Sequence, residues 1–339
     1  MTHVILNTLY VQTQGAYIHL YQDTVRVEVE EEVRLQVPLH HLGGVVVFGN
    51  VLVSPYLIQR FAEDGRFIVW FSASGRFVGR LHGPTSGNVL LRRAQHEVLS
   101  DRARTLHLAR YIVSGKLRNS RQVLLRGLRD LPGSVPAIEE AADNLQVLVN
   151  EVQQASSLDG VRGIEGRGAN LYFTALGHLI RGEFVWTGRT RRPPRDPINA
   201  LLSFAYALLV SDCVAACEGA GLDPQVGYLH ALRPGRPSLA LDLAEEFRSV
   251  LADRLVVSLI NRRQVQPGDF DVRPGGAVVL KDDARRVFLD AYQRRKQEEV
   301  THPLLEQRIP IGLVPYVQAR LLARFLRGDT PKYVPYSIR

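Results

Sequence analysis

The segment Gly227–Arg248 holds the side chains of this sequence that are best placed for chemistry. His230 ends a short apolar run, a turn rich in arginine, proline and glycine follows, and a helical pattern then carries Asp242, Glu245 and Glu246. Because helix positions three and four apart share a face, Asp242 is predicted to lie over both glutamates. One imidazole and several carboxylates meeting there would suit a divalent cation. Taken alone, the segment also fits a structural histidine beside a solvated acidic helix face.

A third acidic candidate is Glu165, in the stretch EGRGANLYF of a helix predicted over residues 164–180, after a glycine-containing turn at 160–163. The glycines of this stretch each cost about 1 kcal/mol relative to alanine inside a helix. They also let another backbone, a ligand or a metal come close. The Glu165 carboxylate lies on the same side as small and aromatic residues, so it needs a partner. That partner is either an arginine or a metal shared with His230.

Arginines gather in the connector RTRRPPRD, which ends at Asp196. Asp196 is placed to cap a buried helix predicted over 197–220, with proline at its first position. A loop of guanidinium groups beside an acidic metal site would suit a phosphodiester, and a solubilising surface loop is an alternative of similar weight. On the helix, Asn199 and Tyr206 are polar residues that are candidates to face the site. The candidate DNA contacts are Arg189, Arg191, Arg192, Arg236 and Arg248.

The composition indicates a partner with negative charge. The formal charge of the 339 residues is +8 and the sequence pI is about 9.7. Arginine supplies nearly all of the positive charge, since the only lysines are Lys116, Lys281, Lys296 and Lys332. Because guanidinium groups bind phosphate oxygens in bidentate fashion, nucleic acid is the partner this composition favours. An arginine-rich codon bias would produce the same counts. A metabolic metalloenzyme is the weakest class, because it would have no evident use for so basic a chain.

Two features indicate a reducing, cytoplasmic location without a membrane. No stretch approaches the roughly 20 uninterrupted apolar residues of a membrane span, and the N-terminus lacks the basic region of a secretory signal. Cys213 and Cys217 are the only cysteines, spaced to lie on one face of the predicted 197–220 helix. Without a second pair, two buried thiols are a better interpretation than half a zinc site.

The pattern along the chain predicts an α+β multidomain protein, with a β-sandwich-like domain followed by an all-α catalytic domain. Residues 1–81 alternate apolar and polar positions, typical of strands with one buried face, and are interpreted as an assembly domain. Residues 82–88 form the clearest linker signal. Residues 89–339 are predicted to form a helical, DNA-binding domain. Its first helix is expected to stop at Gly115, and the helix carrying Asp242 to continue to about Leu259.

In this order and spacing, GIEGRGANLYF, RRPPRDPINALLSFAYALL and GYLHALRPGRPSLALDLAEEFR resemble the CRISPR-associated adaptation integrases, the Cas1 family. The resemblance spans nearly the whole chain. The C-terminal stretch IPIGLVPYVQARLLARFLRGDTPKYVPY is similar to the subtype that accompanies compact type I systems, which is a type I-C-like assignment. The resemblance implies that Glu165, His230 and Glu245 are catalytic metal ligands. It places Asp242 as a further acidic residue of the site.

The same resemblance implies an activity and an assembly. Members form homodimers through their β domains, and two such dimers flank a Cas2 dimer in a heterohexamer. The complex would insert short double-stranded DNA with single-stranded or branched ends into a CRISPR array, with Mg²⁺ or Mn²⁺ as cofactor. The fragment's 3′-hydroxyl would be the nucleophile. Two alternatives stay open: a metal-dependent nuclease of branched DNA in repair, and a non-catalytic DNA-binding scaffold.

Overall fold

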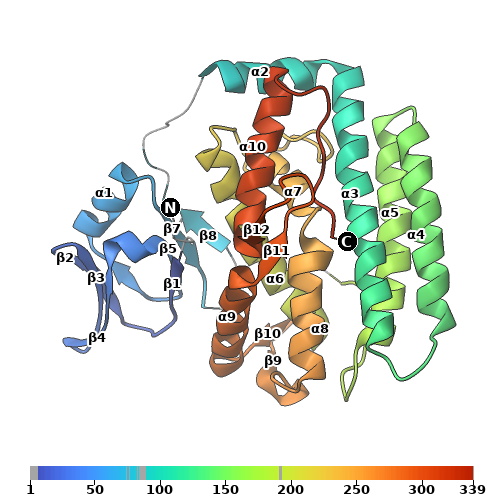
Figure 1. The fold of residues 1–339 in the computed structure, drawn as a ribbon. Coiled ribbons are helices and arrows are strands. Elements are labelled where there is room, and N and C mark those ends of the chain that lie inside the picture. Colours follow the sequence, from blue (N-terminus) through green and yellow to red (C-terminus); the bar gives the residue numbers. More distant parts are fainter. Residues whose placement is uncertain are drawn as a thin grey trace.

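The computed structural model describes residues 7–73, 75, 77–81, 83, 89–190 and 193–338. A β-rich N-terminal part lies to one side of a larger helical part, which confirms the predicted fold class (Figure 1). The predicted linker at 82–88 lies outside the described residues except for Gly83, and so do Arg191 and Arg192.

Two four-stranded sheets build the N-terminal part. The first has the order β1-β5-β7-β8, with parallel pairing of β1 to β5 and of β5 to β7, and the second has the order β4-β3-β2-β6. A short helix, α1, begins at Pro55 because the Ser54 side chain caps it. The strands and the helix are β1 (Asn7–Val11), β2 (Tyr17–Tyr21), β3 (Thr24–Val29), β4 (Glu32–Pro38), β5 (Leu42–Phe48), β6 (Leu52–Val53), α1 (Pro55–Glu63), β7 (Phe67–Phe71) and β8 (Phe77–Arg80).

Strand β5 joins the two parts of the molecule because its side chains alternate between two cores. Val45 and Val47 pack in the core of the β-rich part. Val46 and Phe48 belong to the core of the helical part, where the Phe48 ring lies 6.0 Å from that of Phe204. Because both faces of β5 are buried, its sequence is a continuous apolar run instead of an alternating one.

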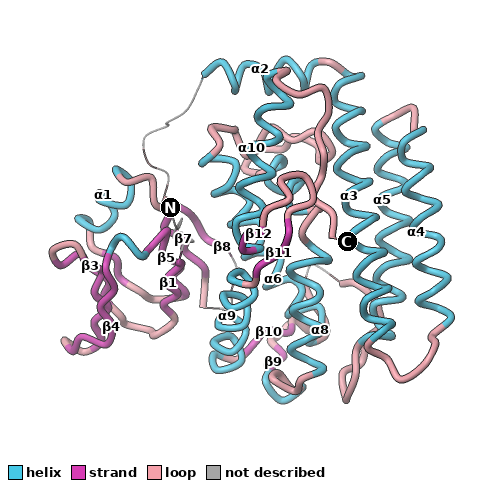
Figure 2. The backbone as a smooth tube through the Cα atoms, in the orientation of Figure 1, coloured by secondary structure: helices cyan, strands magenta, loops and turns pink. Residues whose placement is uncertain are grey.

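The helical part contains ten longer helical segments and two short β-ribbons within the described residues. The ribbons, magenta in Figure 2, add strands to the domain that the sequence predicted to be all-α. The helical segments are α2 (Val89–Ser100), α3 (Arg102–Arg129), α4 (Pro136–Gln154), α5 (Leu158–Leu176), α6 (Pro197–Gly219), α7 (Ser238–Ala244), the π-helical η3 (Arg248–Asp253), α8 (Arg254–Asn261), α9 (Asp282–Gln297) and α10 (Val314–Arg327). One ribbon pairs β9 (Phe270–Val272) with β10 (Val278–Leu280), and the other pairs β11 (Glu299–Thr301) with β12 (Arg308–Pro310).

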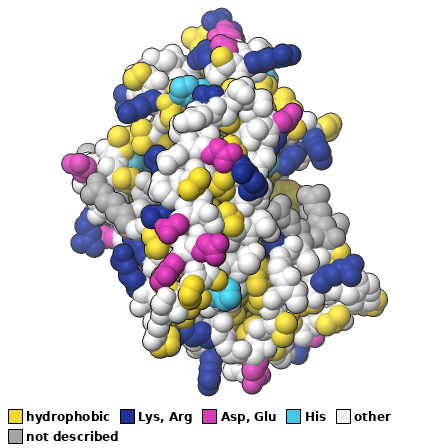
Figure 3. All heavy atoms as spheres, turned by 90° about the vertical axis from the view of Figure 1, so that its right-hand side faces the viewer, with side chains coloured by type: hydrophobic (Ala, Val, Ile, Leu, Met, Phe, Trp, Pro, Cys, Tyr) yellow, Lys and Arg dark blue, Asp and Glu magenta, His cyan; other side chains and the backbone are white. Residues whose placement is uncertain are grey.

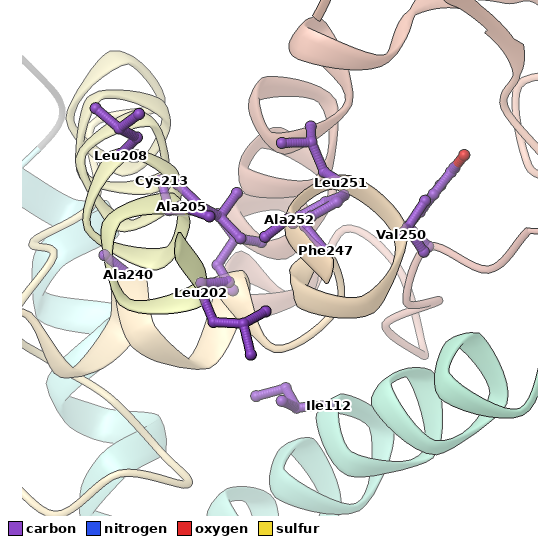
Figure 4. Close-up of a cluster of buried hydrophobic side chains, with 14 of the residues drawn as sticks. Ile112, Leu202, Ala205, Leu208, Cys213, Ala240, Phe247, Val250, Leu251 and Ala252 are labelled. Carbon is purple, nitrogen blue, oxygen red and sulfur yellow. The ribbon is translucent and has the colours of Figure 1, made fainter. Parts of the chain in front are cut away.

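Helix α6 is the central core element. By length and composition it could cross a membrane although polar residues interrupt its apolar sequence, but 61% of its most apolar window is buried inside the protein. Leu202, Ala205 and Leu208 of this helix belong to the same buried cluster as the apolar side chains of the 247–252 segment (Figure 4). Both cysteines of α6 are buried free thiols, as predicted. Its length is therefore used for packing between neighbouring elements.

Three predicted helix boundaries are wrong, and each error has a local cause. The break expected at Gly115 lies earlier, where the Asp101 side chain caps α3, and α3 runs through Gly115. Helix α5 starts before the expected glycine turn because the Ser157 hydroxyl accepts a hydrogen bond from the Gly160 amide. The helix carrying Asp242 ends at Ala244, so the chain turns before η3 begins.

Candidate active site

Lys116, in the middle of α3, brings together two of the predicted ligands. Its Nζ contacts Oε1 of Glu165 on α5 and lies 2.7 Å from Oε2 of Glu245, just after α7. Gly168 explains how α3 comes so close to α5, because a side chain at this position would collide with Leu117. The glycine that looked unfavourable in a helix therefore lets two helices pack closely, which places the ammonium group beside the carboxylates.

Glu245 is a buried carboxylate surrounded by positive charge. Its side chain is 2% exposed, and Arg248 approaches Oε1 to 2.8 Å. His230 Nε2 lies 3.8 Å from the same oxygen. Burial alone would raise the pKa of Glu245, but Arg248, Lys116 and His230 outweigh it and hold the pKa well below its ordinary value. The carboxylate is therefore ionised at neutral pH.

Asp242 orients the His230 ring from the Nδ1 side, opposite the nitrogen that faces Glu245. Its Oδ1 accepts hydrogen bonds from His230 Nδ1 at 2.6 Å and from the His230 amide at 3.0 Å, while Oδ2 accepts from the amides of Tyr228 and Leu229. The Asp242 side chain is fully buried. Because Nδ1 donates to this carboxylate, Nε2 is the ring nitrogen that is left to face Glu245.

A third buried carboxylate, Asp253, lies near Arg248. Its oxygens accept from Tyr206 at 2.6 Å and from Tyr172 of α5 at 2.9 Å, and the Tyr206 ring lies under the Arg248 guanidinium at 5.1 Å. The Arg189 guanidinium lies 5.3 Å from the same ring. Tyr206, a predicted site residue, thus supports the residue that contacts Glu245.

The pKa of Asp253 gives a stability prediction. Burial raises this pKa to about 6, and the hydrogen bonds from Tyr206 and Tyr172 only partly oppose it. The fold therefore favours the neutral acid. The resulting contribution to the free energy of unfolding is fully present below pH about 4. It is lost as the pH rises to about 6, which lowers the free energy of unfolding by about 3 kcal/mol. In Asp253→Asn that loss should be absent. Urea unfolding of both proteins from pH 4 to 7 measures it, and a pH-independent difference between them would contradict it.

Other predicted residues are engaged elsewhere. The Asn199 side chain accepts from Arg189 and from the Thr190 amide, and donates to Gly188 O and Asp196, so it holds the connector onto the start of α6. Asp196 caps α6 as predicted. Arg236 lies half-buried in the turn before α7.

The position of Glu246 contradicts the prediction that Asp242, Glu245 and Glu246 share one face of a helix. Its carboxylate is buried on the side away from Glu245 and accepts from Gln318, Tyr333 and the Tyr336 amide. The residue that sequence reasoning missed is Lys116. Its signal was available, since it is one of few lysines in an arginine-rich chain and lies on a predicted helix.

The donor set has the chemistry of a divalent-cation site. Within the described residues, no three His, Cys, Asp or Glu side chains stand arranged to hold a metal. The Lys116 ammonium instead contacts both Glu165 and Glu245, which marks a position where these two carboxylates accept a shared cation. Carboxylate oxygens with one imidazole nitrogen suit Mg²⁺ or Mn²⁺.

Space for a substrate lies beside His230. A cavity of about 760 Å³ adjoins His230 and is lined also by Thr105, Leu106, Leu158 and Arg162. On the face shown in Figure 3, arginine and lysine side chains are scattered among acidic and apolar ones, so positive charge is not gathered in one patch there. Acidic side chains with one histidine are a donor set that metal-dependent enzymes of phosphodiester bonds use.

Comparison with known proteins identifies the family. The family model of CRISPR associated protein Cas1 matches residues 9–294. The chain is 53% identical to the CRISPR-associated endonuclease Cas1 1 of Moorella thermoacetica, over 99% of this chain and all of that protein. The chain therefore belongs to the Cas1 family of CRISPR-associated endonucleases. Nucleases of this family are metal-dependent.

Two solved structures share the fold at lower identity. A casposase bound to integration product aligns with a TM-score of 0.85 at 21% identity, covering 98% of this chain and 94% of that chain. A chain of a Cas6-RT-Cas1–Cas2 complex aligns with a TM-score of 0.80 at 22% identity, covering 98% of this chain and 36% of that one. At these identities the likeness concerns the fold.

Proposed function

We propose that the chain joins the 3′-hydroxyl of short DNA fragments to the CRISPR array, using Glu165, His230 and Glu245 as ligands for Mg²⁺ or Mn²⁺. The observation that carries the assignment is the contact of Lys116 with both Glu165 and Glu245, with His230 Nε2 3.8 Å from the second carboxylate. Two carboxylates far apart in the sequence meet at one positive group, and the imidazole lies beside the second of them, as a shared cation would require.

Each residue has a role that follows from its contacts. A bound divalent ion supplies polarisation of the scissile phosphate and offsets its charge. Asp242 keeps the His230 Nε2 lone pair directed at the site. Arg248 keeps Glu245 ionised, and Lys116 adds a fixed positive charge where the DNA phosphate would approach.

The fragment's end is proposed to enter through the cavity beside His230, where Arg162 supplies positive charge. Arg189 and Arg248 have their guanidinium groups over Tyr206, so we assign them to supporting the site in preference to contacting DNA directly. The type I-C-like subtype is retained as a proposal and is supported by the C-terminal sequence.

The proposed partners are a second copy, a Cas2 dimer and double-stranded DNA with single-stranded or branched ends, in a heterohexameric complex. The structural match to a chain from a Cas1–Cas2 complex supports the Cas2 partner. The β-rich part supports the homodimer, because the register partners Tyr17 and Leu52 are 40% and 62% exposed on its sheet. Exposed apolar neighbours of this kind favour an interface.

Leu52→Asp is expected to convert the dimer into monomers, because the interface would have to bury an unpaired carboxylate. Val272→Asp is the matched control. Val272 is also an exposed aliphatic residue, with 74% of its surface accessible, but it lies on β9 in the helical part. Light scattering after size exclusion measures both masses. A Leu52→Asp protein that stays dimeric would place the interface elsewhere.

The function is tested by strand transfer into a supercoiled plasmid carrying a repeat, with the Cas2 partner, Mg²⁺ or Mn²⁺, and labelled duplex fragments. Joined fragment–repeat products that disappear with chelator are expected. Hydrolysis of branched DNA without any joining would favour the repair nuclease, and DNA binding without metal-dependent chemistry would favour the scaffold.

A further inference from the structure

The C-terminal segment returns to the catalytic centre. In Figure 1 the end of the chain lies beside α3, and Figure 2 shows the approach to it as a loop. The fully buried Glu246 carboxylate is its main anchor, accepting from Tyr333 Oη at 2.5 Å, the Tyr336 amide at 2.7 Å and Gln318 Nε2 at 2.9 Å. Glu246, the acceptor of this network, has no role in the proposed chemistry.

Asn119 ties the same segment to α3. Its Nδ2 donates to the carbonyl oxygens of Glu246 and Tyr336, both at 2.8 Å, and its Oδ1 accepts from the Ile338 amide at 3.0 Å. Asn119 is fully buried and follows Lys116 by three residues on α3. A single amide group therefore joins the helix of Lys116, the turn after α7 and the C-terminal segment.

The segment also packs closely against α3 at Gly115. A Cβ atom on Gly115 would lie 2.6 Å from Pro335 Cβ, so only glycine lets the proline approach. The Tyr336 ring stacks on Phe247 at 5.7 Å. Contacts with the segment thus occur at the residue before Lys116 and at the two residues after Glu245.

The turn at 245–247 depends on such contacts. Helix α7 ends at Ala244 and η3 begins at Arg248, and between them the amides of residues 245–247 make i→i−3 hydrogen bonds in place of the regular α-helical pattern. The direction of the Glu245 side chain therefore also depends on contacts from outside this turn. Since Glu245 and Glu246 are consecutive, holding the Glu246 carboxylate on one side directs the Glu245 carboxylate to the other, toward Lys116.

We propose that residues 333–338 are a positioning element of the catalytic site, which acts through Glu246 and Asn119 to hold Glu245 opposite Glu165. The proposal rests on the assignment of Glu245 to the proposed function. The segment touches the backbone and side chains that orient the ligand and has no direct contact with Glu245 among the described interactions.

The experiment compares the full chain with a protein ending at Asp329, and with Asn119→Ala and Tyr333→Phe as milder variants. Strand-transfer turnover at saturating DNA should fall about 10- to 100-fold in the truncated protein, since small misplacements of catalytic groups cost this much. KM and the DNA dissociation constant should stay unchanged. Adding a synthetic peptide of residues 328–339 should restore turnover in a saturable way. Lys332→Ala, on the exposed residue just before the segment, is the matched control and should behave as the full chain.

Hydrogen exchange provides a readout that needs no metal or activity. Amides of residues 242–248 should exchange faster in the truncated protein and return to the full-chain rate with the peptide. Unchanged turnover and exchange in the truncated protein would overturn the proposal. So would a rise in KM and dissociation constant at constant turnover, which would make the segment a DNA-binding element. If the full chain itself joins no DNA, the proposed function fails, while the exchange result still decides whether the segment orders the turn. If the truncated protein does not fold, Asn119→Ala and Tyr333→Phe decide by the same measurements.

Discussion

Replacing Glu165 or His230 by alanine is expected to abolish strand transfer while leaving DNA binding largely intact. Each change removes a proposed ligand from the group around Lys116. The loss should exceed about 100-fold, because even outer partners of metal ligands cost about 10- to 100-fold when removed. Purified proteins with Mg²⁺ or Mn²⁺ are compared in the plasmid assay, and DNA affinity is measured separately.

Glu151→Ala is the matched control for these variants. Glu151 is an exposed glutamate on α4 that pairs only with Arg167 among its described interactions. It should retain the activity of the unaltered chain. Full activity in Glu165→Ala or His230→Ala would refute the ligand assignment, whereas a parallel loss of DNA affinity would assign these residues to binding.

Asp242→Ala is expected to have the largest combined effect on stability and turnover. It leaves the amides of Tyr228, Leu229 and His230 without their acceptor in a buried place. An unsatisfied buried donor costs about 1–3 kcal/mol, so a total loss of about 3 kcal/mol or more is expected. The imidazole also loses the partner that fixes its orientation, so turnover should fall in the protein that remains folded.

Urea unfolding and strand transfer measure these two effects of Asp242→Ala. Asp242→Asn is the companion variant, because it keeps one oxygen acceptor and removes the charge. Its stability should lie between those of Asp242→Ala and the unaltered protein. If Asp242→Ala unfolds like the unaltered protein and keeps its turnover, the loop of His230 is held by other contacts and the positioning role of Asp242 is wrong.

The sequence predicted local features well. The period-two pattern gave the β-rich part, and the Asp196–Pro197 pair gave the start of α6, because strand faces and helix caps depend on residues close in sequence. The buried cysteines and the Cas1 family were also confirmed. The proximity of Glu165, His230 and Glu245 was predicted from the resemblance, and their roles as ligands stay a prediction.

Errors arose where a local rule was extended beyond its element. The shared face of Asp242, Glu245 and Glu246 assumed a continuous helix, but the chain turns after Ala244 and the two glutamates diverge. The expected break at Gly115 took glycine as a stop signal, although this glycine is required by the approach of Pro335. For Gly115, tertiary packing overrides the helix-propensity cost of glycine, which is about 1 kcal/mol relative to alanine.

By itself the sequence determined which chemical groups are present and in which local elements they lie: carboxylates, one imidazole, arginine in excess and glycines in helices. Only the tertiary structure decided that Lys116 contacts both Glu165 and Glu245. It also decided that Asp242 accepts hydrogen bonds from the backbone of the His230 loop and that the C-terminal segment reaches Glu246. These contacts join residues tens to hundreds of positions apart. Periodicity and capping act over a few residues only, so such pairings are fixed by how whole helices pack and by the need of each buried charge for a partner.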